Sequence, residues 1–513
     1  MSAAEIADPL PRTTFCPPDS RRFVLFSAIL GSSMGFIDGS VVSLAMPAIR
    51  ADLGASLVDA QWISNGYMLF LSALVLLGGA AGDVFGVRNI FTAGMAVFMA
   101  MSLACALSTD AQMLIVMRAA QGVGAAFMVP GSLAIIAKAY PPETRGRAIG
   151  QWAAFSSLTT AMGPFIGGMV LSFGADWMWR LIFAINVPIG LLALGLLCWR
   201  VPRDRPTEGR TLDIPGALLA TAGLGLMAWG LTSFGLPENA RGVSPFVWLA
   251  AGAAVFAGFI AWEWRARAPM VKLELFRSRA FSGANVFTLV LFFAFNAVLF
   301  FLPMTLVSAW GRPEWEASLA MLPLSLAIAI FSRRAGRLAD RIGPRLPLTA
   351  GAVLMGLSYA GLALTMPLML LWQVTLPVML LNAAGMALLV SPLSAAVMLA
   401  TPDHHTGLAS GVNNAVARAA GLMAVAALGA VASLVFAAAA GANISGAEFG
   451  EMVAAPLDAA AESLRVAASN RAFQAIAAIS SAMCFLAAAI AWFTQPAWQG
   501  GARSPSVVAP VEI

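Results

Sequence analysis

Hydrophobic residues fill the chain in long blocks, which short polar segments separate. A helix needs about 20 consecutive apolar residues to cross a bilayer, and fourteen blocks reach about that length. The pattern therefore predicts an all-α membrane protein with fourteen transmembrane helices. The blocks lie near residues 23–47, 61–82, 89–107, 112–136, 147–172, 180–199, 213–234, 245–264, 282–307, 317–335, 346–366, 371–398, 407–438 and 472–494.

Composition agrees with this prediction and narrows the function. Of the 513 residues, 60% are hydrophobic and 11% are charged, whereas soluble domains average about 45–50% apolar and about 25% charged residues. The formal net charge of +5 invites a nucleic-acid partner, but the basic residues lie in short loops between apolar blocks. Membrane orientation explains them better than phosphate binding does.

The basic residues also predict the orientation. With a cytoplasmic N-terminus, 22 of the 30 lysine and arginine residues lie on the cytoplasmic side and 6 on the opposite side, while Arg118 and Arg418 lie within spans. Cytoplasmic loops carry such an excess, so we expect both termini in the cytoplasm. The polar segment 1–20 is predicted to be disordered. The first apolar run is too long for a cleaved signal peptide, so we interpret it as a retained span.

A repeated loop divides the chain into two related halves. The two copies, offset by 257 residues, are Gly79-x-x-x-Asp83-x-x-Gly86-x-Arg88 and Gly336-x-x-x-Asp340-x-x-Gly343-x-Arg345. This offset holds about eight spans with their loops, so two extra helices lie between two bundles of six. Parallel repeats of this kind are typical of transporters. The predicted parts are a disordered N-terminus at 1–20, a six-helix bundle at 21–200, a two-helix linker at 201–265, a six-helix bundle at 266–495 and a cytoplasmic tail at 496–513.

Two ionisable residues lie deep within predicted spans. Asp38 is the only carboxylate that we place deep in a span, and Arg118 lies in the fourth span. A charged group in hydrocarbon must be paired or face water, and arginine keeps its charge. Asp38 is therefore a candidate for binding the proton or the substrate, and Arg118 is a candidate for acting together with it. The alternative is a purely structural charge or packing hydrogen bond, and the sequence leaves open whether the two side chains meet.

The fifth span carries a run of small residues around a proline. Glycines permit close helix approach, and proline removes a backbone hydrogen bond and kinks a helix. A bend there would help to seal one side of a pathway, and generic packing is the alternative. The residues are Gly163, Pro164, Gly167 and Gly168.

The ninth and thirteenth spans offer candidates for a cavity wall. Adaptable Met and aromatic side chains suit promiscuous binding, but the same stripe of the ninth span also fits a surface that faces lipid. Arg418 of the thirteenth span either lines the cavity or snorkels to the membrane interface. The segment 439–471 reads as a surface helix on the outer side. The ninth-span stripe consists of Phe292, Phe293, Asn296, Phe300 and Met304.

The sequence gives no sign of a metal or an organic cofactor. Its four cysteines show no paired or ligand-like spacing. His404 and His405 are adjacent, and adjacent residues on a helix do not share a face. A Gly-x-x-x-x-Gly-Lys phosphate loop is absent from the sequence, which leaves ATP hydrolysis without support. We expect neither a disulfide nor a metal site nor enzymatic activity.

Several of these stretches resemble motifs of a known family. The repeated loop, above all Gly336–Arg345, resembles the loop signature of the major facilitator superfamily. In that family the acid of the loop caps a neighbouring helix and its basic residues bind helix ends, a latch consistent with the helix dipole. The other stretches are similar to motifs of its fourteen-span drug:proton antiporters, the EmrB/QacA type. They are Ile37–Pro47, Arg118–Ala126, Gly163–Gly168 and Trp179–Gly190.

The resemblance implies a fold and a function. The fold would be two six-helix bundles in pseudo-twofold relation with two extra central helices. The function would be proton-coupled export of small amphipathic or drug-like molecules by alternating access, in a bacterial inner membrane, with the proton gradient as energy source. The alternative is an importer or uniporter of a small metabolite. The fifth-span motif and the count of fourteen spans favour export over this alternative. The implied partners are the solute and the bilayer, and in this family a periplasmic adaptor protein is a further candidate partner.

Overall fold

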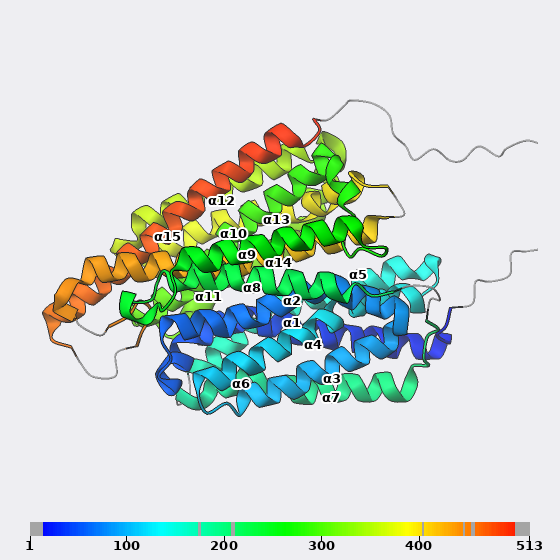
Figure 1. Ribbon diagram of the computed structural model, residues 1–513, viewed down its shortest axis with the longest axis horizontal. Helices are drawn as coiled ribbons and strands as arrows, with labels where there is room; N and C mark the ends of the chain where they lie inside the picture. The colour runs from blue at the N-terminus through cyan, green and yellow to red at the C-terminus, as the bar shows by residue number, and fades with distance from the viewer. Residues whose placement is uncertain are drawn as a thin grey trace, which may run out of the picture.

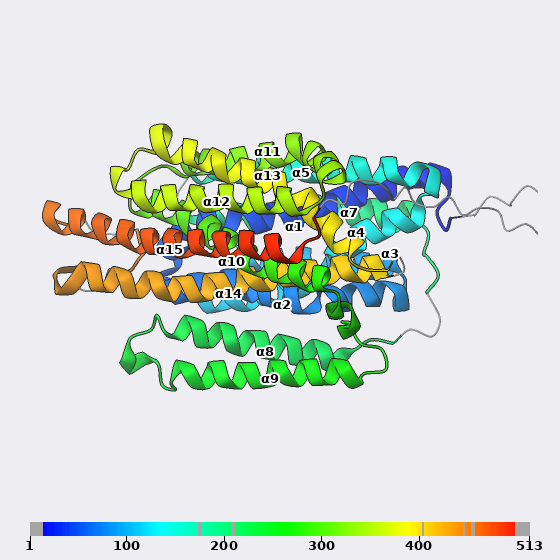
Figure 2. The ribbon, with the colours of Figure 1, turned by 90° about the horizontal axis from the view of Figure 1, so that it is seen from above.

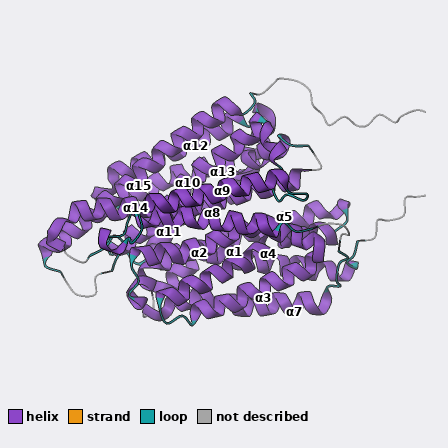
Figure 3. Cartoon of the chain, in the orientation of Figure 1, coloured by secondary structure: helices purple, strands orange, loops and turns teal. Residues whose placement is uncertain are grey.

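The computed structural model describes residues 14–172, 176–206, 211–402, 405–444, 447–452 and 457–497. They form a bundle of long helices (Figure 1), and the described part of the chain holds no strand (Figure 3). The helices are α1 (Pro18–Leu53), α2 (Leu57–Phe85), α3 (Val87–Ala106), α4 (Ala111–Ala139), α5 (Pro142–Ser172), α6 (Trp179–Ala184), α7 (Asn186–Arg200), α8 (Ile214–Ser233), α9 (Pro245–Arg265), α10 (Arg279–Ser308), α11 (Glu314–Ile342), α12 (Arg345–Thr365), α13 (Leu376–Leu399), α14 (Thr406–Ala440) and α15 (Ala459–Thr494).

Most of these helices have the length and the apolar composition of membrane-spanning helices. Among the described residues, 13 helical stretches are long and apolar enough to cross a bilayer, and α6 with α7 makes one of them. In α5 the apolar stretch is shorter and covers Met162–Ser172. The predicted all-α membrane architecture is confirmed, and α5 stays our prediction for a fourteenth span.

The helices pack in two groups that meet along a seam. In the first group α4 packs against α2 and α3, and α1 packs against α5 and α7. In the second, α12 packs against α13 and α15, while α10 packs against α14 and α15. The groups meet where α2 contacts α14 and where α5 contacts α11. The hairpin of α8 and α9 lies to one side (Figure 2), with α8 against both α2 and α14.

The chain gives the bundle two distinct ends. The helix α1 begins and α15 ends at the same end (Figure 1), which we call the termini end. Because α1 and α2 run in opposite directions, the turn at Gly86 between α2 and α3 also lies there. The distal end is the opposite one, and it holds Gly54 and the segment 447–452 between α14 and α15.

Two expectations about helix ends are wrong. Pro18–Ser20, predicted to be disordered, form the first turn of α1, because proline is well suited to the first helical position. The segment 439–471 is not a separate surface helix, since α14 runs to Ala440 and α15 already begins at Ala459. Asp458 starts α15 early by accepting a hydrogen bond from the backbone N–H of Ala461 at 2.7 Å. Residues 1–13 and 498–513 of the predicted termini lie outside the described residues.

Candidate functional site

Asp38 lies in the middle of α1 and is completely buried. Its Oδ2 accepts a hydrogen bond from Arg118 Nη1 at 2.6 Å, and its Oδ1 accepts one from Gln121 Nε2 at 3.0 Å. Both carboxylate oxygens are therefore satisfied by one face of α4. The structure brings together Asp38 and Arg118, which the sequence placed deep in separate spans without showing a contact.

Arg118 is held from three directions and is 2% exposed. Its Nε donates to the backbone oxygen of Ile63 in α2 at 3.1 Å, and its Nη1 also donates to Gln121 Oε1 at 2.7 Å. The guanidinium lies over the ring of Tyr67, 4.3 Å from the centroid, in a cation–π arrangement. These contacts fix the orientation of the guanidinium toward Asp38.

Gln121 is a site residue that sequence reasoning missed. Its amide donates to Asp38 and accepts from Arg118, so it ties the two ions together. The available signal was the spacing, because residues three apart on a helix share a face. An amide at that position can serve both partners at once, since it carries both a donor and an acceptor.

In this arrangement the compensation of the Arg118 charge depends on Asp38. While Asp38 is ionised, it compensates the charge of Arg118, and a buried pair of this kind is stable only with its hydrogen bonds complete. A proton on Asp38 would leave Arg118 uncompensated and favour a rearrangement of α1 against α4. Space reaches close to the acid, because the neighbouring Gly39 is exposed and a methyl group there would contact nothing within 4 Å.

The glycines of α5 sit at the contact between the two groups of helices. A methyl group at Gly163 would lie 3.2 Å from Ser40 Oγ in α1, and one at Gly168 would lie 2.8 Å from the backbone oxygen of Glu314 in α11. A methyl group at Gly167 would collide with α1. The small residues therefore let α5 approach its own group and the other group closely. Between them, Pro164 lies inside the helix.

The distal end holds an ion pair that the sequence did not reveal. Arg50 of α1 is 3% exposed and donates to Glu448 Oε2 at 2.8 Å and to the backbone oxygen of Phe449 at 2.7 Å. Glu448 also accepts a hydrogen bond from the backbone N–H of Leu57, at the start of α2, at 2.7 Å. The segment after α14 is thereby fastened to the start of α2. We call Arg50, Glu448 and Phe449 the distal latch.

A second contact joins α5 to α11 at the distal end. Ser172 Oγ donates to Glu314 Oε2 at 3.1 Å and accepts from the backbone N–H of Trp315 at 3.0 Å. This contact lies one turn beyond Gly168, at the end of α5. Together with the distal latch, it joins the two groups of helices at the distal end on both sides of the seam.

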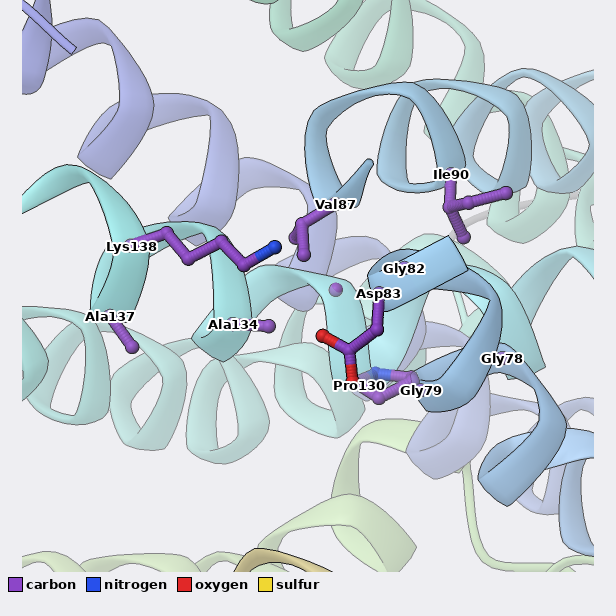
Figure 4. A pocket seen from close by; sticks show the side chains of 11 residues that line it. Gly78, Gly79, Gly82, Asp83, Val87, Ile90, Pro130, Ala134, Ala137 and Lys138 are labelled. Atoms are coloured by element: carbon purple, nitrogen blue, oxygen red, sulfur yellow. The ribbon is translucent and has the colours of Figure 1, made fainter. Parts of the chain in front are cut away.

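The first copy of the repeated loop borders a small cavity at the termini end. The cavity has a volume of about 240 Å³, and Gly79 and Asp83 of α2 and Lys138 of α4 are among the residues that line it. Figure 4 shows the Asp83 carboxylate and the Lys138 side chain around this space. Gly86, the third residue of the motif, has a φ of 88°, a conformation that glycine adopts at low cost.

The acid that caps α3 is Asp204, which the sequence did not single out. Its two oxygens accept the backbone N–H groups of Val87 and Arg88, each at 2.9 Å, and Lys138 Nζ lies 3.2 Å from Oδ2. The Arg88 side chain donates to the backbone oxygens of Leu197 and Cys198 near the end of α7. A basic residue of the loop thus binds a helix end, the kind of contact that the latch interpretation requires.

The second copy of the loop has a similar backbone and different side-chain contacts. Gly343 has a φ of 79°, so both copies need glycine at the same position. Arg345 lies over the ring of Trp492 at 3.8 Å from the centroid, which ties α12 to α15. Asp340 is exposed at the end of α11, and Gly336 lies near α13.

The cavity-lining candidates fall into two classes. Phe300 and Met304 of α10 are buried in the core, so they do not face lipid. Phe292 and Asn296 are half-buried, and the Asn296 Nδ2 donates to the backbone oxygen of Phe292 at 2.7 Å. Arg418 is half-buried and lies on α14, the helix that contacts α2 where the two groups meet.

Known proteins match most of the chain. The profile of the Major Facilitator Superfamily matches residues 28–425. The methylenomycin A resistance protein of Bacillus subtilis (strain 168) is 34% identical over 417 residues, which cover 80% of this chain and 87% of that protein. The tetracenomycin C resistance and export protein of Streptomyces glaucescens is 32% identical over 413 residues, covering 79% and 74%.

A solved structure shares the fold. It is a bacterial homologue of the human lysosomal transporter Spinster in an inward-facing and unoccupied conformation. The TM-score is 0.64 at 17% identity, over 94% of this chain and all of that one. The profile match, the identities and the shared architecture together show that this chain belongs to the Major Facilitator Superfamily.

Proposed function

We propose that this protein exports small amphipathic, drug-like compounds in exchange for protons, by alternating access of a central site to the two sides of the membrane. Membership of the superfamily makes the chain a multi-pass membrane transporter rather than an enzyme. Similar proteins are named for antibiotic resistance and export, which supports a drug-like solute. Proton exchange is our own inference from the site.

The observation that carries the proposal is the buried network of Asp38, Arg118 and Gln121. A carboxylate without any exposure would be a poor choice for structure alone, because an apolar pair of similar volume is often as stable. An ionisable residue at membrane depth is typical of proton and substrate pathways. Among the residues that the structure describes, the Asp38 oxygens accept hydrogen bonds only from α4, so a change in its protonation would act directly on the contact between α1 and α4.

The helix contacts support alternating access. The distal latch and the Ser172 contact with Glu314 join the two groups of helices at the distal end. These contacts are a few polar bonds and close glycine packing, which can break and re-form as a unit. We infer that this conformation is closed at the distal end, and that the cycle requires the distal contacts to open.

The basic residues support an orientation for this cycle. The excess of 22 among 30 lysine and arginine residues on the termini side favours cytoplasmic termini under the positive-inside rule. The distal end then faces away from the cytoplasm, which suits export. With α5 as a fourteenth span, the chain would follow the EmrB/QacA type in a bacterial inner membrane.

The test is proton movement in proteoliposomes on addition of lipophilic dyes and antibiotics. We expect the wild type to move protons with at least one compound of the panel, and Asp38→Asn to abolish that flux while the protein still folds. Asp110→Asn is the matched control, because Asp110 is an exposed cap of α4 that binds Met113 N–H at 2.8 Å and asparagine caps helices equally well. It should transport like the wild type.

Two outcomes would overturn the proposal. Undiminished flux in Asp38→Asn would remove the coupling acid from the mechanism. Solute movement without proton movement in the wild type would favour a uniporter on the same fold.

A further inference from the structure

Arg418 of α14 is another deep arginine, and it lacks the counter-ion that Arg118 has. It lies about three turns inside the helix that begins at Thr406. Its Nε is buried without a hydrogen-bond partner. No carboxylate among the residues that the structure describes pairs with it, whereas Asp38 lies 2.6 Å from Arg118. The two arginines thus both lie inside long apolar helices and differ in compensation.

The surroundings of Arg418 are polar and come from both groups of helices. It lies on α14, which packs against α2 of the first group and α10 of the second. One turn earlier on the same face of α14, Asn414 is exposed although it lies within an apolar helix. One turn later, Gly421 makes room for Asn296 of α10, since a methyl group at Gly421 would lie 3.1 Å from Asn296 Cγ.

This geometry leaves a positive charge that an anion in the same space would compensate. An isolated charge away from water is unfavourable unless it is paired. The nearest deep acid, Asp38, already uses both oxygens on Arg118 and Gln121, so it is not available. The half-buried Arg418 therefore carries an uncompensated guanidinium on a helix of the seam. A guanidinium binds planar carboxylates with two parallel hydrogen bonds.

We propose that Arg418 binds the acidic group of the transported solute, and that the solute class is amphipathic organic acids with a carboxylate or sulfonate. The Asn296 amide has a second N–H available for this acidic group, because its bond to the backbone oxygen of Phe292 uses only one of its two donors. The half-buried Phe292 beside it provides an apolar surface for the body of the solute. The inference rests on the proposed transport function only in taking the seam as the solute path.

The test compares an acid with its neutral amide on the purified full-length protein. Dansyl-leucine and dansyl-leucine amide differ in one charged group, and dansyl-glycine and dansyl-phenylalanine with their amides vary the size. Binding is followed by dansyl fluorescence in nanodiscs of phosphatidylcholine only, so that no anionic lipid competes. The variants are Arg418→Gln, Arg418→Lys and, as matched control, Arg267→Gln, which removes a charge from an exposed loop position.

We expect the wild type to bind at least one acid about tenfold or more tightly than its amide. Loss of a hydrogen bond to a charged group weakens binding by about 10- to 100-fold, so Arg418→Gln should lose that preference and leave the amide affinity within about twofold. Arg418→Lys should keep part of the preference, because lysine retains the charge without the fork. Arg267→Gln should bind like the wild type.

An anionic lipid headgroup would satisfy the same guanidinium, and a second set of nanodiscs separates the two sources. Phosphatidylglycerol discs should weaken acid binding only modestly if the solute is the ligand. Loss of all acid binding in these discs would assign the site to lipid and overturn the proposal.

Three further results would overturn it. They are equal affinities of the wild type for acid and amide, absence of binding for every acid, and an unchanged acid preference in Arg418→Gln. The two readouts separate this inference from the proposed function, because binding in nanodiscs is measured without a proton gradient. An acid preference without proton exchange in the wild type would sustain the binding site and remove antiport.

Discussion

Arg50→Gln opens the distal latch without touching the buried acid network. Arg50 is the part of the latch that belongs to α1, and its guanidinium reaches Glu448 and the backbone oxygen of Phe449 beyond α14. Glutamine is too short to span the same gap. We expect the variant to populate the distally open conformation more than the wild type does.

The size of the expected shift follows from the two hydrogen bonds that Arg50 makes to Glu448 and to the backbone oxygen of Phe449. The bond to Phe449 is made by a cation that is 3% exposed, and a hydrogen bond of this kind contributes about 1.5–3 kcal/mol. The Glu448 side chain is 46% exposed, so water screens the ion pair to about 0.5–1 kcal/mol. The variant should therefore lose about 2–4 kcal/mol of closed-state stability, a shift of about 30- to 700-fold in the equilibrium between closed and open conformations.

Double electron–electron resonance (DEER) measures this shift directly, as a change in the distribution of distances between two spin labels. Thr109 and Ala460 are exposed near the distal end, one in each group of helices, and accept labels after substitution by cysteine. The background is Cys198→Ser, because Cys198 is exposed while the other three cysteines are buried. The expected result is a larger fraction of long distances in Arg50→Gln reconstituted in nanodiscs.

A distal arginine with purely local bonds provides the control. Arg241 donates to the backbone oxygens of Leu236 and Phe234 within its own connection between α8 and α9. Arg241→Gln removes the same chemistry at the same end and should leave the distances unchanged. An unaltered distance distribution in Arg50→Gln, or an equal change in both variants, would refute the role of the latch.

Two other substitutions test the packing of the helix ends. Gly168→Ala places a methyl group 2.8 Å from a backbone oxygen of α11 and should slow dye export from cells, because it opposes closure of the distal end. Gly146→Ala is the control, since its methyl group would meet nothing within 4 Å, and it should export dye at the normal rate. Equal export rates for the two variants would contradict this account. Asp204→Ala removes the acceptor of two N–H groups at the start of α3 and the partner of Lys138. It should lower stability by about 1–2 kcal/mol in thermal unfolding, whereas the exposed Asp340→Ala should not, and an equal loss in both variants would argue against the cap.

The sequence predicts the spans well because hydrophobicity at membrane depth is a local property. Each helix must satisfy its own backbone inside the bilayer, so a block of apolar residues reports a helix without knowledge of its neighbours. The repeated glycines are similarly local, since Gly86 and Gly343 both adopt a positive φ. The depth of Asp38 could be inferred from its block in the same way.

The contacts between residues far apart in the chain could not be predicted in this way. Arg50 and Glu448 are separated by almost the whole chain, and each looks like an ordinary loop charge until the segment after α14 folds onto α2. Asp204 likewise caps a helix that begins more than a hundred residues earlier. The pairing of Asp38 with Arg118 depends on how α1 packs on α4, which single-sequence patterns do not encode.

The contrast between Arg118 and Arg418 has an energetic consequence for the proposed exchange. One arginine is neutralised by an acid of the protein, and in our proposal the other is neutralised by the acidic group of the solute. If a monoanion leaves as a proton enters, both movements carry positive charge inward across the membrane. Each charge gains about 2.3 kcal/mol per 100 mV of an inside-negative potential, so the potential drives both halves of the cycle. For a neutral solute it would drive only the proton.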